Sequence, residues 1–373
     1  MNFTAGTDVR CSGCGIRVQS EHKDALGYIP QAASERMPLL CQRCYRMKHY
    51  NEASSVTRDQ GEFLRLLGGI AATDSLVVHI TDIFDFEGSV ISGLQRFVGD
   101  NPVVLVVNKI DLIPNDVNPN RIRNWVQRRA KEEGLRIADA VLVSAKRNIG
   151  FDRLADTLGQ LRQGKDIFVV GATNVGKSSF INRLISDYSS LEAELTVSSY
   201  PGTTLDLVHI PLDDEKHIID TPGIVYEWRL TERLHKSDLA AIVPTRTLKP
   251  VTYQLNPRQT LFFGGLARFD FVEGGRQSFT CYVSNGIEIH RTKLENADAL
   301  YAEHKGTLLK PPGKEEDGGL GPMTKHRFTI RPGSNTDVYI SGLGWVRSHG
   351  KEGAVIDVHV PKGIKVITRE SLI

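Results

Sequence analysis

The chain has 373 residues, 40% of them hydrophobic and 24% charged, and its formal net charge is only +2. These are ordinary globular values with length for two or three domains, so they exclude a largely disordered chain and a fibrous repeat. The charge balance also differs from that of dedicated nucleic-acid binders, which are strongly basic.

No apolar run approaches the ~20 residues that cross a bilayer, and residues 1–11 lack the apolar stretch of a secretory signal. We therefore expect a cytoplasmic protein without a membrane partner. The charge is uneven along the chain: residues 1–60 carry 8 basic and 6 acidic side chains, residues 61–244 carry 20 and 25, and residues 245–373 carry 18 and 13. Two basic ends around an acidic middle suit a polyanion-binding protein, but charge alone leaves nucleic-acid contact open.

Residues 1–60 are predicted to form a small metal-organised module. Cys11, Cys14, Cys41 and Cys44 form two CxxC pairs, and four thiolates suit a tetrahedral structural zinc site. An iron–sulfur or redox role and incidental thiols are the alternatives. The basic residues and tyrosines around the second pair, at 43–50, suit the phosphates and bases of RNA, and a solvated face is the equal alternative.

Residues 61–244 have an α/β pattern. Residues 62–70 have helical apolar spacing, and from Ser75 onward four apolar runs each end in a polar or Gly-rich turn, as buried parallel strands do. Between them, the segment from Arg121 has the basic and apolar positions of an amphipathic surface helix.

Residues 245–373 read as a basic, β-rich C-terminal domain that binds RNA or a partner. Short alternating runs are separated by glycines, which indicates antiparallel strands. Ser284-Asn285-Gly286 predicts a hairpin turn, because Asn and Gly tolerate the positive φ of a tight turn. Residues 308–323 are rich in Gly, Pro and charge, which predicts a long loop.

The clearest motif is GATNVGKS, from Gly171 to Ser178, between an apolar strand and a helical segment. It fits the phosphate loop GxxxxGK[ST], in which backbone N–H groups surround the phosphates. Lys177 is expected to reach the β- and γ-phosphates and Ser178 to hold Mg²⁺. A glycine-rich turn that binds nothing is the alternative. The residues predicted to line the phosphates here are Gly171, Asn174, Val175, Gly176, Lys177, Ser178 and Ser179.

Guanine selection is predicted from Asn108-Lys109-Ile110-Asp111. A carboxylate at Asp111 can accept hydrogen bonds from the N1–H and the exocyclic amine of guanine, whereas adenine offers no such donor pair. Asn108 is expected to contact the base and buttress the phosphate loop, and the stem of Lys109 to cover the base plane.

Ser144-Ala145-Lys146 follows the next strand and is expected to offer a backbone N–H to the guanine carbonyl. By itself this tripeptide could be an ordinary strand end. Its position one βα unit after Asp111 favours the nucleotide role.

Two further elements lie downstream of the phosphate loop. Asp220-Thr221-Pro222-Gly223 ends a strand, so Asp220 is expected to act on Mg²⁺ and the Gly223 N–H to meet the γ-phosphate. Pro201-Gly202-Thr203-Thr204 supplies a hydroxyl for Mg²⁺, and we choose Thr204 over Thr203. The residues predicted to stabilise charge during hydrolysis are Lys177, Ser178, Thr204, Asp220 and Gly223.

These motifs together resemble the translation-factor-related GTPases, but the base-recognition motifs precede the phosphate loop. With the CxxC pairs in front and the basic β-rich region behind, the chain resembles the YqeH family of circularly permuted GTPases over essentially its full length. The resemblance implies an α/β P-loop GTPase domain of permuted topology between a zinc module and a β-rich domain. It also implies a role in assembling the small ribosomal subunit, with GTP, GDP, Mg²⁺ and Zn²⁺ as cofactors.

Catalysis is expected to be slow. Ile224 occupies the position after Gly223 where Ras-like enzymes place a water-orienting Gln, and its side chain forms no hydrogen bond. Asn174 resembles the asparagine that ligates K⁺ in some related GTPases, although it could simply fit the loop conformation.

The sequence therefore predicts a GTP-hydrolysing switch that contacts ribosomal RNA or a small-subunit precursor. A passive RNA-binding assembly scaffold with structural nucleotide is the alternative from another class. A GTP-gated RNA-modification factor is a third, although the C-terminal region shows no separate catalytic constellation. The sequence does not define the oligomeric state.

Overall fold

The computed structural model describes residues 60–188, 196–199, 206–212, 214–313, 320–350 and 352–373, together with residues 9, 18–21, 28–30, 39, 41 and 42. Their contacts divide the chain into two compact units, and each is described by itself. The first unit comprises Met1–Asp82, Ser89–Ile110 and Val126–Val225. The second comprises Ile83–Gly88, Asp111–Trp125 and Tyr226–Ile373, so it includes three stretches of the predicted 61–244 range, namely 83–88, 111–125 and 226–244.

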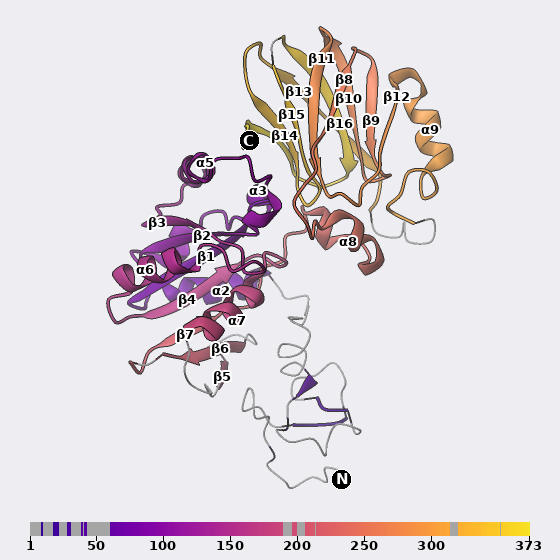
Figure 1. Cartoon of the computed structure of the whole chain (residues 1–373). Coiled ribbons are helices and arrows are strands. Elements are labelled where there is room, and N and C mark those ends of the chain that lie inside the picture. The colour runs from indigo at the N-terminus through magenta and orange to yellow at the C-terminus, as the bar shows by residue number, and fades with distance from the viewer. Residues whose placement is uncertain are drawn as a thin grey trace. The chain divides into compact units, whose positions relative to one another are not determined.

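The first unit is built on a seven-stranded sheet with the strand order β3-β2-β1-β4-β7-β6-β5 (Figure 1). Its first four strands and β7 are mutually parallel, whereas β6, near one edge, is antiparallel to both of its neighbours, β7 and β5. The strands are β1 (Ser75–Asp82), β2 (Val103–Asn108), β3 (Asp139–Leu142), β4 (Asp166–Gly171), β5 (Thr196–Ser199), β6 (Asp206–Pro211) and β7 (His217–Asp220).

The central strands form because their sequences are almost wholly apolar. Every residue of β1 and β2 is buried, which is the pattern of parallel strands covered on both faces. The helices between residues 60 and 188 are α2 (Gln60–Ile70), α3 (Phe86–Ser89), α4 (Leu94–Val98), α5 (Pro119–Glu132), α6 (Phe151–Arg162) and α7 (Lys177–Tyr188), with a 3-10 turn, η2 (Ile110–Leu112). Most of α3, η2 and the first half of α5 belong to the second unit. The predicted α/β architecture of this region is confirmed, including the helix at 62–70.

The second unit contains a β-sandwich of two five-stranded sheets, ordered β12-β9-β10-β16-β13 and β17-β14-β15-β11-β8. All its strand pairs are antiparallel. The strands are β8 (Val251–Leu255), β9 (Gln259–Phe263), β10 (Ala267–Gly274), β11 (Gln277–Val283), β12 (Ile289–Lys293), β13 (Met323–Ile330), β14 (Thr336–Ile340), β15 (Gly344–Ser348), β16 (Ala354–Pro361) and β17 (Val366–Glu370).

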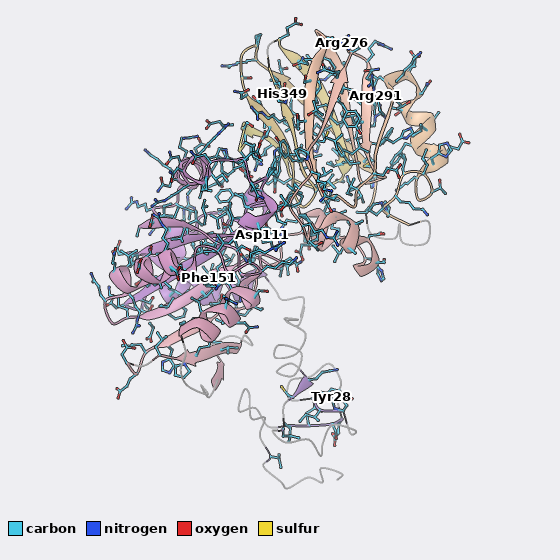
Figure 2. All side chains as sticks on the ribbon, viewed as in Figure 1. Tyr28, Asp111, Phe151, Arg276, Arg291 and His349 are labelled. Atoms are coloured by element: carbon cyan, nitrogen blue, oxygen red, sulfur yellow. The ribbon has the colours of Figure 1, made fainter. Side chains whose placement is uncertain are left out.

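The two sheets enclose an aromatic core. Phe269 and Phe271 of β10 meet Phe279 of β11 edge to face, at centroid distances of 5.3 and 5.0 Å. Figure 2 shows how densely side chains fill this unit, with Arg291 of β12 labelled. The remaining elements are η3 (Leu230–Glu232), α8 (Lys236–Ile242), η4 (Leu294–Asn296) and α9 (Ala297–His304). The predicted β-rich C-terminal region is confirmed.

The hairpin predicted at Ser284-Asn285-Gly286 is wrong. A turn is present, with the Ile287 N–H donating to the Ser284 carbonyl at 3.0 Å. However, β11 pairs with β15 and β8 while β12 pairs with β9, so the turn carries the chain from one sheet to the other. Neither Asn285 nor Gly286 has positive φ. The sequence indicated the turn, but the pairing was decided by which apolar faces meet across the sandwich.

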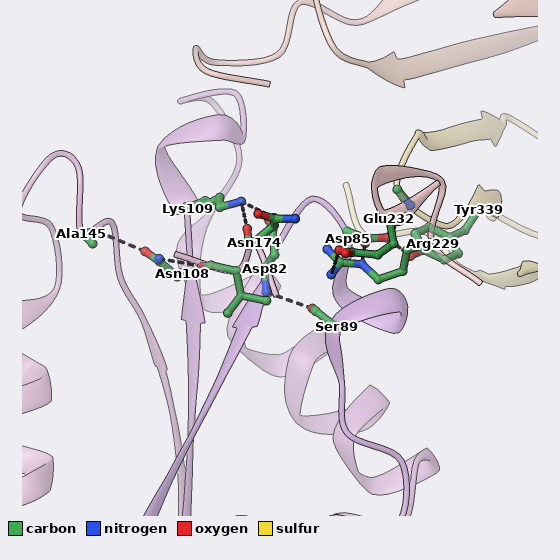
Figure 3. A network of polar contacts seen from close by, with 12 residues as sticks. Asp82, Asp85, Ser89, Asn108, Lys109, Ala145, Asn174, Arg229, Glu232 and Tyr339 are labelled. Carbon is green, nitrogen blue, oxygen red and sulfur yellow. Dashed lines mark hydrogen bonds and ion pairs between the residues drawn. The ribbon is translucent and has the colours of Figure 1, made fainter. Parts of the chain in front are cut away.

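A buried charge network holds Ile83–Gly88 within the second unit (Figure 3). The Arg229 Nε lies 2.6 Å from the Asp85 carboxylate, and both side chains are at most 3% exposed. Burial alone would raise the pKa of Asp85, but the Arg229 charge and hydrogen bonds from the Tyr339 hydroxyl and the Gly342 N–H hold it below its ordinary value. The carboxylate therefore stays charged inside the unit.

A second buried pair joins the same segment to β17. The Arg369 guanidinium contacts the Glu87 carboxylate. It also lies over the rings of Trp125, Tyr339 and Trp345, at 5.0, 4.8 and 5.2 Å from their centroids. Cation–π contacts of this kind are strongest when they are shielded from water. Residues 83–88 and Trp125 are thus integral parts of the second unit's packing.

Candidate functional site: a nucleotide-binding sheet edge

The phosphate loop connects β4 to α7 as predicted. Its glycines are required because an added Cβ would come too close to neighbouring atoms and because the backbone has a positive φ at Gly176. A Cβ on Gly171 would lie 2.8 Å from the Ile80 carbonyl oxygen. Gly176 has a φ of +85°, and a Cβ there would lie 2.5 Å from the Asn108 Nδ2. The backbone can therefore make this turn only without side chains at these positions. Val175 between them is buried, whereas Asn174 is exposed.

The segment after β7 is held against the phosphate loop by main-chain hydrogen bonds. The Thr173 N–H donates to the Ile224 carbonyl at 2.8 Å, and the Ile224 N–H donates to the Gly171 carbonyl at 3.1 Å. Gly223 fits beside this ladder, because a Cβ there would lie 3.3 Å from the Thr173 backbone. The two phosphate motifs, 50 residues apart in sequence, thus share one backbone framework.

Lys177 and Asp220 meet at this framework. The Lys177 ammonium contacts the Asp220 carboxylate and the Thr221 carbonyl, and the two charged side chains are 10% and 14% exposed. The predicted phosphate-binding lysine and the predicted magnesium-directed carboxylate are therefore brought together. Ser178 and Ser179 follow in the first turn of α7, half-buried.

Asn108 joins three predicted motifs. It ends β2 with its side chain buried. Its Nδ2 donates to the Val175 carbonyl at 3.0 Å, and its Oδ1 accepts the Ala145 N–H at 3.1 Å (Figure 3). One amide thereby links the base-recognition motif to the phosphate loop and to the Ser144–Lys146 tripeptide.

Lys109 makes a contact that the sequence reasoning missed. Its Nζ lies 2.6 Å from the Asp82 carboxylate and 2.6 Å from the Asn174 carbonyl (Figure 3). Asp82 is the last residue of β1, and its partner across the parallel ladder is Asn108, the last residue of β2. An aspartate that ends an apolar strand parallel to the Asn108 strand is the signal that could have identified it.

The Ser144–Lys146 tripeptide lies just after β3. Ser144 is fully buried, and its hydroxyl accepts the Arg147 N–H at 3.0 Å. Gly150 closes this loop with a φ of +79°, where a Cβ would lie 2.2 Å from the Leu142 carbonyl oxygen. Ala145 is half-buried, whereas Lys146 is exposed. The Ala145 N–H is engaged by Asn108, so the loop is positioned by the base motif itself.

Asp111 opens the 111–125 segment of the second unit, three residues after Asn108. It lies in η2, half-buried, and its main-chain carbonyl accepts the Thr247 hydroxyl at 2.8 Å. The Leu112 carbonyl accepts the Leu248 N–H at 2.8 Å, so both residues are tied to residues 247–248.

Several predicted ligands lie outside the described residues: Cys11, Cys14, Cys44 and Thr204. Cys41 is described and is 1% exposed. Within the described part of the chain no group of three His, Cys, Asp or Glu residues is arranged to hold a metal ion. None of the described helices is long and apolar enough to span a bilayer.

A cradle of glycines beside a lysine and a carboxylate, placed where parallel strands end, fits a nucleoside triphosphate with its Mg²⁺. Comparison with known protein families agrees with this interpretation of the site. A family model described as a 50S ribosome-binding GTPase matches residues 166–261. A second model, described as YqeH-like, C-terminal, matches residues 276–372. The chain therefore has a P-loop GTPase domain.

Its relatives define the family more narrowly. The chain is 50% identical over 365 residues to the uncharacterized protein YqeH of Bacillus subtilis, covering 98% of this chain and 99% of that one. It is 29% identical to NO-associated protein 1 of Arabidopsis thaliana, covering 97% and 76%. GTPase Der of Clostridium botulinum is 32% identical over 36% of this chain and 30% of its own. The chain belongs to the YqeH family.

Proposed function

We propose that this protein is a GTP-hydrolysing switch that acts in ribosome assembly, at the small subunit, by contacting ribosomal RNA or a subunit precursor in a nucleotide-dependent way. The observation that carries the nucleotide part is Asn108, whose single amide links the base motif, the phosphate loop and the Ser144–Lys146 tripeptide. The ribosomal part is supported by family membership and by the description of the GTPase model.

Guanine selection is assigned to Asp111. Its carboxylate would accept two hydrogen bonds from guanine, and adenine would leave that charge without donors. Lys109 would cover the base with its stem, since Asp82 and the Asn174 carbonyl fix its ammonium group. The Ala145 N–H already donates to Asn108 and lies in the loop that would face the guanine carbonyl.

Hydrolysis would use the framework shared by the two phosphate motifs. Lys177 would bind the β- and γ-phosphates, and the Gly223 N–H would stabilise the γ-phosphate as charge develops. Mg²⁺, held by Ser178 with Thr204 and Asp220, would supply charge neutralisation when bound. The Ile224 side chain is 2% exposed, so it would not orient an attacking water, and we propose slow intrinsic turnover.

The order of the motifs supports circular permutation. The strands that carry the base motifs, β2 and β3, come early in the chain, yet the sheet places β1 directly beside the phosphate-loop strand β4. Joining old termini and opening one loop leaves such a sheet intact. We propose that this domain is a permuted GTPase.

Zn²⁺ and K⁺ remain proposals. Four thiolates at residues 11, 14, 41 and 44 suit structural zinc. Asn174 lies within the phosphate loop, has a φ of +63° and is exposed, and K⁺ bound there would supply charge beside the phosphates. Faster GTP hydrolysis in potassium than in sodium salts is expected, and equal rates would remove K⁺ from the proposal.

The sharpest test of the nucleotide assignment is Asp111→Asn. The amide loses one acceptor and gains a donor, so it disfavours the guanine amine but can donate to the C2 carbonyl of xanthine. We expect the variant to lose GTP hydrolysis and to hydrolyse xanthosine triphosphate. Retained preference for GTP, or uptake of ATP by the unmodified protein as readily as GTP, would contradict the assignment.

The ribosomal assignment has its own test. Cosedimentation with purified small subunits should be stronger with a non-hydrolysable GTP analogue than with GDP, or the reverse. Multiple-turnover hydrolysis should rise when subunits are added, which a passive scaffold would not show. Equal cosedimentation in both nucleotide states together with unstimulated hydrolysis would leave a scaffold as the better description.

A further inference from the structure

We infer that Thr247 and Asn285 are positioning residues that orient Asp111 for guanine selection, and this inference rests on the guanine-binding role proposed for Asp111. All three residues belong to the second unit. Thr247 lies in the strap, defined as residues 245–249, between α8 and β8. Asn285 lies in the turn between β11 and β12. Neither positioning residue is part of a nucleotide motif.

The strap is hydrogen-bonded to two successive carbonyls of η2. The Thr247 hydroxyl donates to the Asp111 carbonyl at 2.8 Å. The Leu248 N–H donates to the Leu112 carbonyl, also at 2.8 Å. The last carbonyls of a short helix have no partner within the helix itself. The strap supplies those partners, and it therefore fixes the two peptide groups that directly follow the Asp111 α-carbon.

Asn285 holds the strap from its other side. Its Oδ1 accepts the Lys249 N–H at 2.9 Å, and its Nδ2 donates to the Thr247 carbonyl at 3.0 Å. Leu248, between these two positions, is only 2% exposed. A continuous series of contacts therefore runs from the amide of Asn285 through Thr247 to the backbone of Asp111.

These contacts explain why the turn contains Asn and Gly. The usual reason for the pair is positive φ in a tight turn, and neither Asn285 nor Gly286 has positive φ. A Cβ on Gly286 would lie 2.9 Å from the Ala241 carbonyl oxygen, so glycine permits a close approach to α8. Asn285 is exposed, and its amide is used for the strap.

The orientation of η2 matters because guanine recognition is directional. The Asp111 carboxylate is expected to meet the N1–H and the exocyclic amine of guanine together, and hydrogen bonds weaken steeply below about 120°. The aspartate side chain is short, so the backbone largely sets where its carboxylate lies. The carbonyl that Thr247 binds is attached to the same α-carbon as that side chain. Loss of the Thr247 hydroxyl should therefore loosen the carboxylate.

The same contacts should contribute little to stability. The two hydrogen bonds of Asn285 are exposed, and that of the Thr247 hydroxyl is only partly buried. Hydrogen bonds that water can replace make small net contributions to folding. Their substitution should consequently change base selection more than it changes the unfolding of the second unit.

The test compares GDP with inosine diphosphate, whose base lacks the exocyclic amine of guanine. Both Kd values come from competition with a fluorescent GDP analogue on the full chain. The base ratio, defined as Kd for inosine diphosphate divided by Kd for GDP, reports the contact between the Asp111 carboxylate and that amine. A merely structural role would weaken both nucleotides equally and leave the base ratio unchanged.

The variants remove the contacts one at a time. Thr247→Val removes the hydroxyl at nearly constant volume, and Thr247→Ser retains it. Asn285→Ala removes both amide contacts. The matched control is Thr307→Val, which removes a hydroxyl that donates to the His304 carbonyl at 2.9 Å, outside the strap.

We expect Thr247→Val to lower the base ratio about two- to tenfold, the range that corresponds to loss of one hydrogen bond. Asn285→Ala should lower it less, because the Thr247 hydroxyl remains. Thr247→Ser and Thr307→Val should keep the ratio of the unmodified protein. Without nucleotide, amide hydrogen exchange in residues 110–113 should be faster in Thr247→Val than in Thr307→Val.

The outcomes separate this inference from the function on which it rests. An unchanged base ratio in Thr247→Val and Asn285→Ala, with a lowered ratio in Asp111→Ala, would overturn the positioning role and leave guanine selection by Asp111 standing. An unchanged ratio in Asp111→Ala would overturn the guanine assignment itself. An equal fall in Thr307→Val would assign the effect to general destabilisation and also overturn the positioning role. If Thr247→Val does not fold, Asn285→Ala decides, because its side chain is exposed.

Discussion

The two units use charge in opposite ways. In the first unit, Lys177 and Asp220 form a pair whose side chains are 10% and 14% exposed, at the end of a sheet and beside a loop. In the second, Arg229 and Asp85 form a pair that is 1% and 3% exposed and is further held by Tyr339 and Gly342. The first pair can exchange partners with a ligand, because water and phosphate can reach it. The second cannot, because separation would leave a buried charge without solvent.

The difference teaches where function and rigidity reside in this chain. Groups that must bind a triphosphate keep partial access to water and are aimed by glycine-rich backbone. Groups that fix residues 83–88 to the sandwich are fully desolvated and have several partners each. The contrast predicts that substitutions in the first set change activity more than stability, and that those in the second set do the reverse.

The largest expected effect is that of Asp85→Ala. The change leaves Arg229 buried without its main partner, which costs about 3 to 5 kcal/mol of unfolding free energy. Urea unfolding monitored by tryptophan fluorescence measures it. Asp298→Ala is the matched control, since it removes a carboxylate that is 93% exposed from Arg268, and its cost should be far smaller. Similar losses in both variants would erase the contrast between buried and accessible pairs.

The Asp85 carboxylate also determines how the stability of the fold changes at low pH. Because the pKa of Asp85 is lowered on folding, its contribution is complete above the unfolded pKa of about 3.9 and is lost as pH falls through the folded value. Below about pH 4 the unmodified protein should therefore lose stability more steeply than Asp85→Ala. If the unmodified protein and Asp85→Ala lost stability equally steeply below pH 4, Asp85 would not be charged in the folded state.

Lys177→Ala should have the next largest effect, on catalysis. Loss of a charge that stabilises the transferring phosphate lowers kcat/KM for GTP by about 10² to 10³. Lys165→Ala is the control, because its ammonium pairs with Asp74 at 2.7 Å outside the phosphate motifs. Its GTP hydrolysis should match that of the unmodified protein. The unfolding free energy of Lys177→Ala should fall less than that of Asp85→Ala, and a larger fall would break the comparison.

A matched pair of glycines separates backbone strain from site geometry. Gly176 and Gly134 have φ of +85° and +76°, so Ala at either position costs about 1 to 2 kcal/mol. Only at Gly176 would the new Cβ meet a neighbour, the Asn108 Nδ2 at 2.5 Å, whereas Gly134 faces open space. Gly176→Ala should therefore abolish binding of a fluorescent GDP analogue while Gly134→Ala preserves it. Equal binding would show that Asn108 adjusts freely.

Asp82→Asn should have the smallest effect. It removes the charge that holds the Lys109 ammonium but leaves the Asn174 carbonyl as a second acceptor. Loss of one partly accessible charge-assisted hydrogen bond corresponds to about 1.5 kcal/mol, which weakens guanine-nucleotide binding about tenfold. Calorimetry with GDP measures it, with Lys109→Met and the double variant completing a cycle. Additive effects of the two substitutions on GDP binding would contradict a coupling between Asp82 and Lys109.

Much of the site could be predicted from sequence because its chemistry is local. Gly171–Ser178 lies between a strand and a helix, and Asp220–Gly223 ends a strand, so short-range pattern placed both. Asp82 was missed because its role comes from register: it lies opposite Asn108 only after β1 and β2 pair. The residues that contact Asp85 in the second unit are more than 140 residues away, so the sequence around Asp85 does not identify them.

The sequence by itself determined the strand and helix types, the turns and the nucleotide motifs, since these follow from apolar periodicity, glycine geometry and side-chain chemistry over a few residues. Only the tertiary structure decided that the turn at 284–286 joins two sheets, and that Ile83–Gly88 and Asp111–Trp125 group with the sandwich. These outcomes depend on which buried faces and charges find partners far along the chain, and that choice is a property of the packed whole.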